Sequence, residues 1–276
     1  MTDNTEDSTA PVLYELRDNI AVITLNRPSQ ANAQNKDLLL ALDEAWTRAA
    51  QDINAKVIVL KANGKHFSAG HDMTTTPEQQ QQWMADVKDS GISTLYELER
   101  NLYLGLSRKW RDVPKPSIAI VQGVCIAAGL MLCWPCDIII AADNATFSDP
   151  VVMMGIGGVE YHGHTWELGA RKAKEMLFTG MAIDAEEAHR LGMVNQVYAL
   201  DEVESEAMKM AARIAKMPPF GVAMAKRAVN KTLDIMGQYA AIQSVFDSHS
   251  LGHGNATAQS GWPVLVDLEQ LKSREK

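Results

Sequence analysis

The chain has 276 residues, of which 46% are hydrophobic and 22% are charged, the balance of an ordinary globular protein. Its net charge of −8 disfavours binding to nucleic acid, which needs a basic surface. No apolar run is long enough to span a membrane, and the polar start MTDNTEDSTAP is unlike a signal peptide. We therefore expect a cytoplasmic protein with no membrane and no nucleic-acid partner.

The first part of the chain alternates strand and helix signals. Residues 1–10 are polar and predict a disordered tail. Residues 12–16 and 20–25 alternate apolar and polar side chains and predict a β-hairpin, and the β-branched run 57–60 predicts a strand buried on both faces. Asn35 is a plausible N-cap for a helix between them. That helix is indicated by apolar residues at helical spacing: Leu38, Leu42, Ala45, Trp46 and Ala49.

Residues 73–93 show the least regular pattern. Pro77 follows three threonines, a polar glutamine run comes next, and Trp83 and Met84 stand out as apolar. Two interpretations stay open: a solvated connection with these two side chains tucked against the core, or a lid over a pocket. A new helix is then predicted by leucines and a tryptophan at helical spacing: Leu95, Leu98, Leu102, Leu106 and Trp110.

Residues 118–158 form the central stretch of the chain. They predict a buried strand (118–121), a glycine turn, a short helix opening at 127–129, and a second strand (137–142). The first N–H groups of a helix have no partner within it and suit a developing negative charge. A second small-residue turn, 67–72, follows the earlier strand. Two such turns can supply the two convergent donors of an oxyanion hole.

Three cysteines, Cys125, Cys133 and Cys136, lie in this stretch. An odd number within one apolar segment does not indicate a disulfide framework. The C-x-x-C spacing has no second pair to complete a metal site, so we interpret these residues as small buried hydrophobes in a reducing compartment.

Helix signals dominate the rest of the chain. Residues 167–178 and 185–191 predict helices, and 194–198 predicts a short strand. Beyond residue 200 we expect only helices, the last of which is clear only at its start, near residue 238. The sequence thus predicts an α/β core over 11–200 and a helical C-terminal region over 201–276.

An ordered set of short motifs from about residue 11 to 235 resembles the crotonase (enoyl-CoA hydratase/isomerase) superfamily. The matching pieces are Asn26-Arg27-Pro28, Phe67-Ser68-Ala69-Gly70-His71-Asp72, Lys115-Pro116 before Gln122-Gly123, Ala128-Gly129, Cys136-Asp137-Ile138, Phe147, Phe178-Thr179-Gly180, Ala185-Glu186-Glu187-Ala188 and Gly192-Met193-Val194-Asn195. The resemblance implies an α/β fold, a crotonase-like spiral of ββα turns with a helical C-terminal extension.

The resemblance also implies an enolate intermediate derived from an acyl-CoA thioester, with coenzyme A as part of the substrate and no permanently bound cofactor. The backbone N–H groups of His71 and Ala128 match the oxyanion donors. We interpret the His71 side chain as merely occupying its turn, because the matched residue is often small. The positions expected to bind substrate or coenzyme A are Arg27, Ala31, Ala69, Gly70, Asp72, Met73, Gly129, Met131 and Val151.

Hydratases of this family hold and activate one water with two glutamates. The matched positions here carry Met131 and Val151, and neither side chain can exchange a proton. We therefore expect no conventional hydration and a more apolar pocket wall.

Glu160 offers a different carboxylate. It matches a position that carries an acid in dienoyl-CoA isomerases, a dehalogenase and a diketone hydrolase that resemble this stretch. Burial would raise its pKa and suit it to proton transfer near neutrality, whereas an exposed loop glutamate would have no such role. His162 and His164 follow in H-x-H spacing, but no third ligand is near, so we predict no metal site. Either histidine could orient Glu160 or relay a proton, or each could be an ordinary surface or core histidine.

The sequence thus predicts an acyl-CoA enzyme with isomerase-type chemistry on Glu160. The alternatives are a C–C bond hydrolase of a β-diketone or ring ketone, in which His162 or His164 helps Glu160, and a non-catalytic acyl-CoA-binding protein. The resemblance further implies a homotrimer or a dimer of trimers, in which the helical region 201–276 serves oligomerisation. Phe246 and His249 lie where a neighbouring subunit could cover the acyl pocket.

Overall fold

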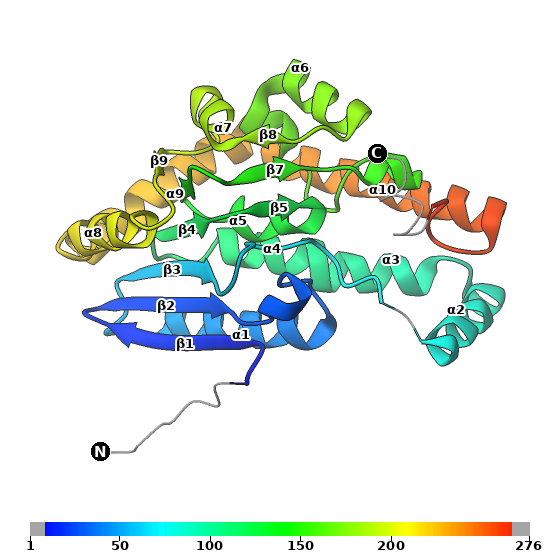
Figure 1. Ribbon diagram of the computed structural model, residues 1–276, viewed down its shortest axis with the longest axis horizontal. Coiled ribbons are helices and arrows are strands. Elements are labelled where there is room, and N and C mark those ends of the chain that lie inside the picture. The colour runs from blue at the N-terminus through cyan, green and yellow to red at the C-terminus, as the bar shows by residue number, and fades with distance from the viewer. Residues whose placement is uncertain (1–8, 75, 267–276) are drawn as a thin grey trace.

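A computed structural model describes residues 9–74 and 76–266 of the chain. The larger of its two sheets has six strands in the order β1-β2-β3-β4-β6-β9 (Figure 1). The hairpin β1–β2 is antiparallel, as predicted, and every other pair in this sheet is parallel. The strands are β1 (Val12–Arg17), β2 (Ile20–Leu25), β3 (Val57–Ala62), β4 (Ser117–Val121), β6 (Ile138–Ala142) and β9 (Gln196–Tyr198).

A second sheet contains β5 (Val124–Ile126), β7 (Thr146–Ser148) and β8 (Ile183–Asp184). None of these strands was predicted, because two or three residues are too few to show an alternating pattern. The sheet matters for the site because β5 begins just after the Gly123 turn and leads directly into the short helix at residue 127.

Helices cover both faces of the larger sheet, whose central strands are buried throughout. On one face, α1 (Lys36–Gln51) stacks Trp46 on Trp110 of α4 (Gly105–Arg111), with ring centroids 6.1 Å apart. The side chain of Asn35 caps α1 as predicted, accepting a hydrogen bond from the Leu38 N–H. On the other face, α8 (Val203–Ala215) packs its alanines close to the strands.

The helix predicted by Leu95 to Trp110 is confirmed, but it is not uniform. It consists of α3 (Ser93–Glu99), a π-helical turn η2 (Arg100–Leu104) and α4. A π-turn places an extra residue in one turn of helix and is frequent at functional sites.

Residues 73–93 are more regular than the sequence indicated, since most of them form α2 (Pro77–Ser90). Thr76 and Gln79 form a reciprocal capping box at its start. The helix buries no residue, and Met84 is 64% exposed, so the interpretation with both apolar side chains tucked inward is wrong for Met84. Trp83 contacts Trp262 edge-on, with centroids 5.8 Å apart. Whether α2 acts as a lid stays a prediction.

The remaining helices are α6 (His164–Thr179), α7 (Ala185–Leu191), α9 (Pro219–Ile235) and α10 (Gln238–Ser260). Gly180 ends α6 in the left-handed conformation, and α10 runs beside α3 in Figure 1. The predicted tail lies outside the described residues except for Thr9 and Ala10, as does the end of the helical region after residue 266. Among the residues that the structure describes, no helix combines the length and apolar character needed to cross a bilayer.

Candidate active site

The two turns predicted to face each other are in direct contact at Gly70. This residue has φ of 85°, and a Cβ atom there would lie only 2.9 Å from the Ile126 carbonyl oxygen and 3.3 Å from the Ala128 nitrogen. Only glycine satisfies both the backbone conformation and the close approach. The structure therefore brings the backbone of the first turn next to the predicted donor of the second.

The backbone N–H of His71 is directed away from the neighbouring loop. His71 forms a parallel bridge with Gln34, in which the Gln34 N–H donates to Gly70 and the Gln34 carbonyl accepts from Asp72. In this pattern the N–H of the middle residue faces the opposite side.

The N–H of Ala128 lies in the first turn of a short helix formed by η3 (Ala127–Gly129) and α5 (Leu130–Cys133). Helix amides in this position have no partner within the helix. Ala127 has φ of 49°, an uncommon conformation for a residue with a Cβ atom and one that clusters at functional sites. The two N–H groups predicted to bind the oxyanion thus belong to turns that meet at Gly70, and their binding of an anion stays a prediction.

The residues expected to hold coenzyme A also gather here. The Arg27 guanidinium pairs with the Asp72 carboxylate at 3.0 Å, and the Ala69 N–H donates to the Ala31 carbonyl at 2.9 Å. Residue 31 follows the short helix η1 (Pro28–Gln30). The Asp72 carboxylate also accepts from Thr74, and these contacts hold its pKa below the usual range despite partial burial.

The pocket-wall positions are also near these turns. Met131 is 2% exposed on α5, and Val151 is half-buried at the start of η4 (Val151–Met154). Gly129 packs so closely that a Cβ atom would lie 2.7 Å from the Ser68 carbonyl. Met73 packs against the small cluster of Met154 and Ile156.

Glu160 points inward and is 2% exposed, so the exposed-loop alternative is wrong. Its Oε1 lies 2.9 Å from Nε2 of the His71 side chain. The interpretation that this side chain merely occupies its turn is therefore wrong as well. One residue, His71, joins the predicted oxyanion turn to the predicted catalytic carboxylate.

The pKa of Glu160 moves in the direction opposite to the one expected from burial. Burial raises it, but the positive charges of His71 and His249 and the hydrogen bond from His71 together lower it to about 2. The expectation of a raised pKa is wrong because the sequence did not reveal these two histidines as its neighbours. Glu160 is ionised at neutral pH.

His162 and His164 do not contact Glu160 in the way that the sequence suggested. His162 Nε2 lies 2.9 Å from the Thr165 hydroxyl, and His164 Nε2 lies 2.9 Å from the Asp149 carboxylate. Burial and the neighbouring His164 lower the pKa of His162 to about 4. His71 and His249 take the place that the sequence assigned to this pair.

Sequence reasoning missed a group of polar residues around Glu160. Tyr103 of η2 stacks on the His71 ring, with centroids 4.0 Å apart. His249 Nε2 lies 3.9 Å from Glu160 Oε1 and 3.4 Å from Glu99 Oε2, and Glu160 and Glu99 raise the pKa of His249 to about 9 against the opposing effect of burial. His249 and Phe246 reach this region from the chain's own α10, so a neighbouring subunit is not needed to supply them.

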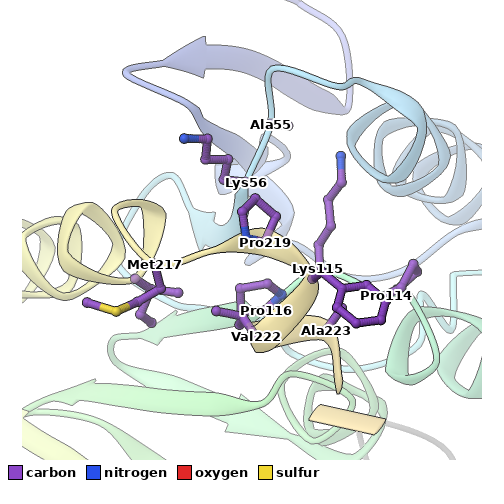
Figure 2. A pocket seen from close by; sticks show the side chains of 11 residues that line it. Ala55, Lys56, Pro114, Lys115, Pro116, Met217, Pro219, Val222 and Ala223 are labelled. Atoms are coloured by element: carbon purple, nitrogen blue, oxygen red, sulfur yellow. The ribbon is translucent and has the colours of Figure 1, made fainter. Parts of the chain in front are cut away.

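Two other features lie apart from these residues. Figure 2 shows a pocket between the start of α9 and the segment before β4, lined by residues such as Lys56, Pro116 and Pro219, and none of the predicted site residues lines it. The sulfur atoms of Cys133 and Cys125 lie 3.9 Å apart. Burial raises the pKa of Cys133, as expected for a buried hydrophobe.

Comparisons with known proteins agree with this architecture. The family model described as enoyl-CoA hydratase/isomerase matches residues 15–260. The chain is 60% identical to a probable enoyl-CoA hydratase from Mycobacterium smegmatis of known crystal structure, with a TM-score of 0.85 over 93% of this chain and 99% of that one. A probable enoyl-CoA hydratase from Mycobacterium thermoresistibile gives 60% identity and a TM-score of 0.86 over 92% and 98%.

The chain is also similar to a putative enoyl-CoA hydratase of Mycobacterium tuberculosis, EchA13. The two are 40% identical over 257 residues, which cover 88% of this chain and 81% of EchA13. Sequence match, fold and motif order therefore agree. The chain is an enzyme of the enoyl-CoA hydratase/isomerase family.

Proposed function

We propose that this enzyme moves a double bond within an acyl-CoA thioester by isomerase-type proton transfer. The backbone N–H groups of His71 and Ala128 hold the enolate oxygen, and the His71–Glu160 pair carries the proton. The observation that supports this proposal is the 2.9 Å contact between Glu160 Oε1 and His71 Nε2, because it places the carboxylate next to the predicted oxyanion turn.

The chemistry needs only one proton carrier. A base removes a proton from the carbon next to the thioester carbonyl, the enolate oxygen accepts hydrogen bonds from two N–H groups, and the proton returns to another carbon. Each donor of this kind stabilises the transition state by about 3–4 kcal/mol. Hydration would need a water held between two proton-exchanging groups, and Met131 and Val151 cannot supply them.

The pair is a better proton carrier than Glu160 alone. A carboxylate with a pKa near 2 is a weak base at neutral pH, and the most effective general base has a pKa close to the working pH. Histidine is the side chain that most readily changes charge in that range. In this arrangement a neutral His71 donates its Nε2 hydrogen to Glu160, and its Nδ1, which has no hydrogen-bond partner among the described residues, takes the proton. The Glu160 carboxylate stabilises the imidazolium that results, and this is the His71 charge that lowers the pKa of Glu160.

The test compares 3-enoyl-CoA isomerisation with crotonyl-CoA hydration by wild type and Glu160→Gln. We expect isomerisation without rapid hydration in wild type, and a loss of about 10²–10⁴-fold in Glu160→Gln. Glu186→Gln, at an exposed position on α7, is the matched control and should retain full activity. Rapid hydration of crotonyl-CoA by wild type would refute the proposal.

His71→Ala separates the side chain from the backbone donor, since alanine keeps the N–H group. We expect kcat to fall while thioester binding is retained. His189→Gln, at an exposed position, is the control. An unchanged kcat in both His71→Ala and Glu160→Gln would refute the role of this pair, and no turnover by wild type with thioesters still bound would favour the acyl-CoA-binding alternative. The hydrolase alternative relied on His162 or His164 beside Glu160, and their contacts are with Thr165 and Asp149.

We also propose that the enzyme is a homotrimer or a dimer of trimers, with coenzyme A entering only as part of the substrate. The support is α9, which buries no residue and leaves Phe220, Val229 and Ile235 between 61% and 78% exposed. Apolar residues gathered on one exposed helix are typical of an interface. A monomeric mass in light scattering would contradict this proposal.

A further inference from the structure

Beyond the His71–Glu160 pair, three buried side chains converge between α3 and α10. They are Glu99 of α3 and His249 and His253, which lie one helical turn apart on α10. Glu99, His249 and His253 are 3%, 5% and 9% exposed. Their ligand atoms all lie within 4.8 Å of one another.

Backbone carbonyls fix both imidazole rings. His249 Nδ1 lies 2.7 Å from the Gly158 carbonyl oxygen, and His253 Nδ1 lies 2.6 Å from the Pro263 carbonyl oxygen. A carbonyl can only accept, so each Nδ1 carries a hydrogen, and each ring presents a lone pair on Nε2 once that nitrogen has released its proton. A histidine whose other nitrogen donates to a carbonyl is the arrangement found in metal sites.

Both Nε2 atoms face each other and the carboxylate. They lie 3.1 Å apart, His253 Nε2 is 3.2 Å from Glu99 Oε1, and His249 Nε2 is 3.4 Å from Glu99 Oε2. Glu99 Oε2 is buried without a hydrogen-bond partner among the described residues. Three acceptor groups thus converge where the low local dielectric makes unpaired lone pairs costly.

We propose that Glu99, His249 and His253 form a binding site for a divalent transition-metal ion of the zinc class. Zinc binds imidazole nitrogen and carboxylate oxygen at about 2.0–2.2 Å, which puts two ligand atoms of a tetrahedral site about 3.3 Å apart. The three distances above, from 3.1 to 3.4 Å, bracket that separation. Mg²⁺ and Ca²⁺ prefer oxygen ligands, so two imidazoles favour zinc, cobalt or nickel.

A proton is a poorer occupant than a metal ion. A proton on His249 Nε2 is directed at one acceptor at a time, whereas His253, Glu99 and Glu160 all surround this nitrogen. A single divalent cation would satisfy the two nitrogens and the carboxylate together. It would also fasten α10 to α3 at the place where His249 approaches Glu160. The site does not depend on which reaction the enzyme performs.

The test is a cobalt titration of tag-free enzyme that has been dialysed against a chelator. We expect visible d–d absorption that saturates at one Co²⁺ per chain and is displaced by Zn²⁺. A hundredfold excess of Zn²⁺ over its Kd should raise Tm by about 5–10 °C. Glu99→Gln and His253→Ala should each lose the cobalt spectrum, and the exposed-site control His189→Gln should keep it.

The wild-type titration alone can overturn the proposal, so it does not depend on whether the variants fold. Absence of saturable d–d bands in wild type would show that protons satisfy the cluster. Retention of the full spectrum in both Glu99→Gln and His253→Ala, with folding verified by circular dichroism, would place the metal elsewhere. In both cases the isomerase assay with Glu160→Gln still stands as a separate measurement.

Discussion

The last two helices, α9 and α10, contrast with each other. α9 has an apolar pattern and yet buries no residue, whereas α10 has little apolar periodicity and buries seven residues, among them His249, Ser250 and His253. Polar side chains can therefore help to fix a helix to the core when buried groups of opposite charge lie opposite them. In α10 those partners are Glu99 and Glu160, which come from α3 and from the loop before α6.

His249→Ala is the strongest way to break this arrangement. Removing one partner of a buried ion pair leaves the other charge uncompensated and costs about 3–5 kcal/mol. We expect the free energy of unfolding in urea to fall by that amount, because His249 holds the positive charge, of a proton or of a bound metal ion, that lies beside Glu99 and Glu160 in this buried region. The control His189→Gln, at an exposed position, keeps a side-chain donor for the Val194 carbonyl and should change it by about 0.5 kcal/mol at most.

Glu167 contrasts with Glu160, because burial raises the pKa of its carboxylate and no histidine lowers it. Burial alone raises its pKa from 4.5 to about 7. The contribution of Glu167 to stability is then greatest below pH 4.5, where the group is protonated in both states, and it is lost as pH rises to 7, because the unfolded state ionises first. At about 1.4 kcal/mol per pKa unit, the loss is at most about 3.5 kcal/mol.

Glu167→Gln should therefore flatten this pH dependence and stabilise the protein at pH 8. Urea unfolding at pH 5 and pH 8 measures both effects. Glu175→Gln, on the same helix but exposed, should change stability by only about 0.5 kcal/mol. Equal pH slopes for wild type and Glu167→Gln would contradict the prediction.

The double substitution Val229→Ser and Ile235→Ser tests whether the exposed apolar residues of α9 form a subunit interface. Because both side chains are exposed in the single chain, the free energy of unfolding of an isolated subunit should change by about 0.5 kcal/mol or less. The mass measured by light scattering should fall from that of the assembly toward that of the subunit. A double variant that keeps the wild-type mass would show that α9 is not the interface.

The most local effect is expected at α2, which is held by its cap rather than by burial. Thr76→Ala removes the capping side chain and should destabilise this helix by about 1 kcal/mol. Because α2 buries no residue, the loss should be local. Hydrogen exchange should quicken across residues 77–90 while the urea midpoint stays nearly constant, and a large midpoint shift would contradict this view.

The sequence predicted the parts of the molecule that local patterns control. The β1–β2 hairpin and the Asn35 cap were both predicted, because each depends on a few neighbouring residues. The approach of the turns at residues 70 and 128 followed from motif order within the family. The predictions of the hairpin and of the cap were correct because side-chain periodicity and cap chemistry act over one or two turns of chain.

The sequence did not predict the polar surroundings of Glu160. His249 lies 89 residues beyond Glu160 along the chain, and no local pattern reports that proximity. The sign of the Glu160 pKa shift was therefore wrong, since burial was foreseen and the histidines were not. The four-residue spacing of His249 and His253 was the available signal, but it is informative only once that segment is known to be helical.

The π-turn at η2 lets the helix that carries Glu99 absorb a change in chain length. A π-turn holds one residue more than an α-helical turn, so deleting exposed Asn101 would convert that turn to a regular one without disturbing Leu104. The segments on both sides would keep their faces, with Glu99 still toward α10 and Trp110 still on α1. The same deletion in a regular α-helix would instead rotate one side by about 100°, the angle of one helical residue. A single-codon deletion at this turn would thus spare the acidic partner of α10, whereas one elsewhere in the helix would remove it.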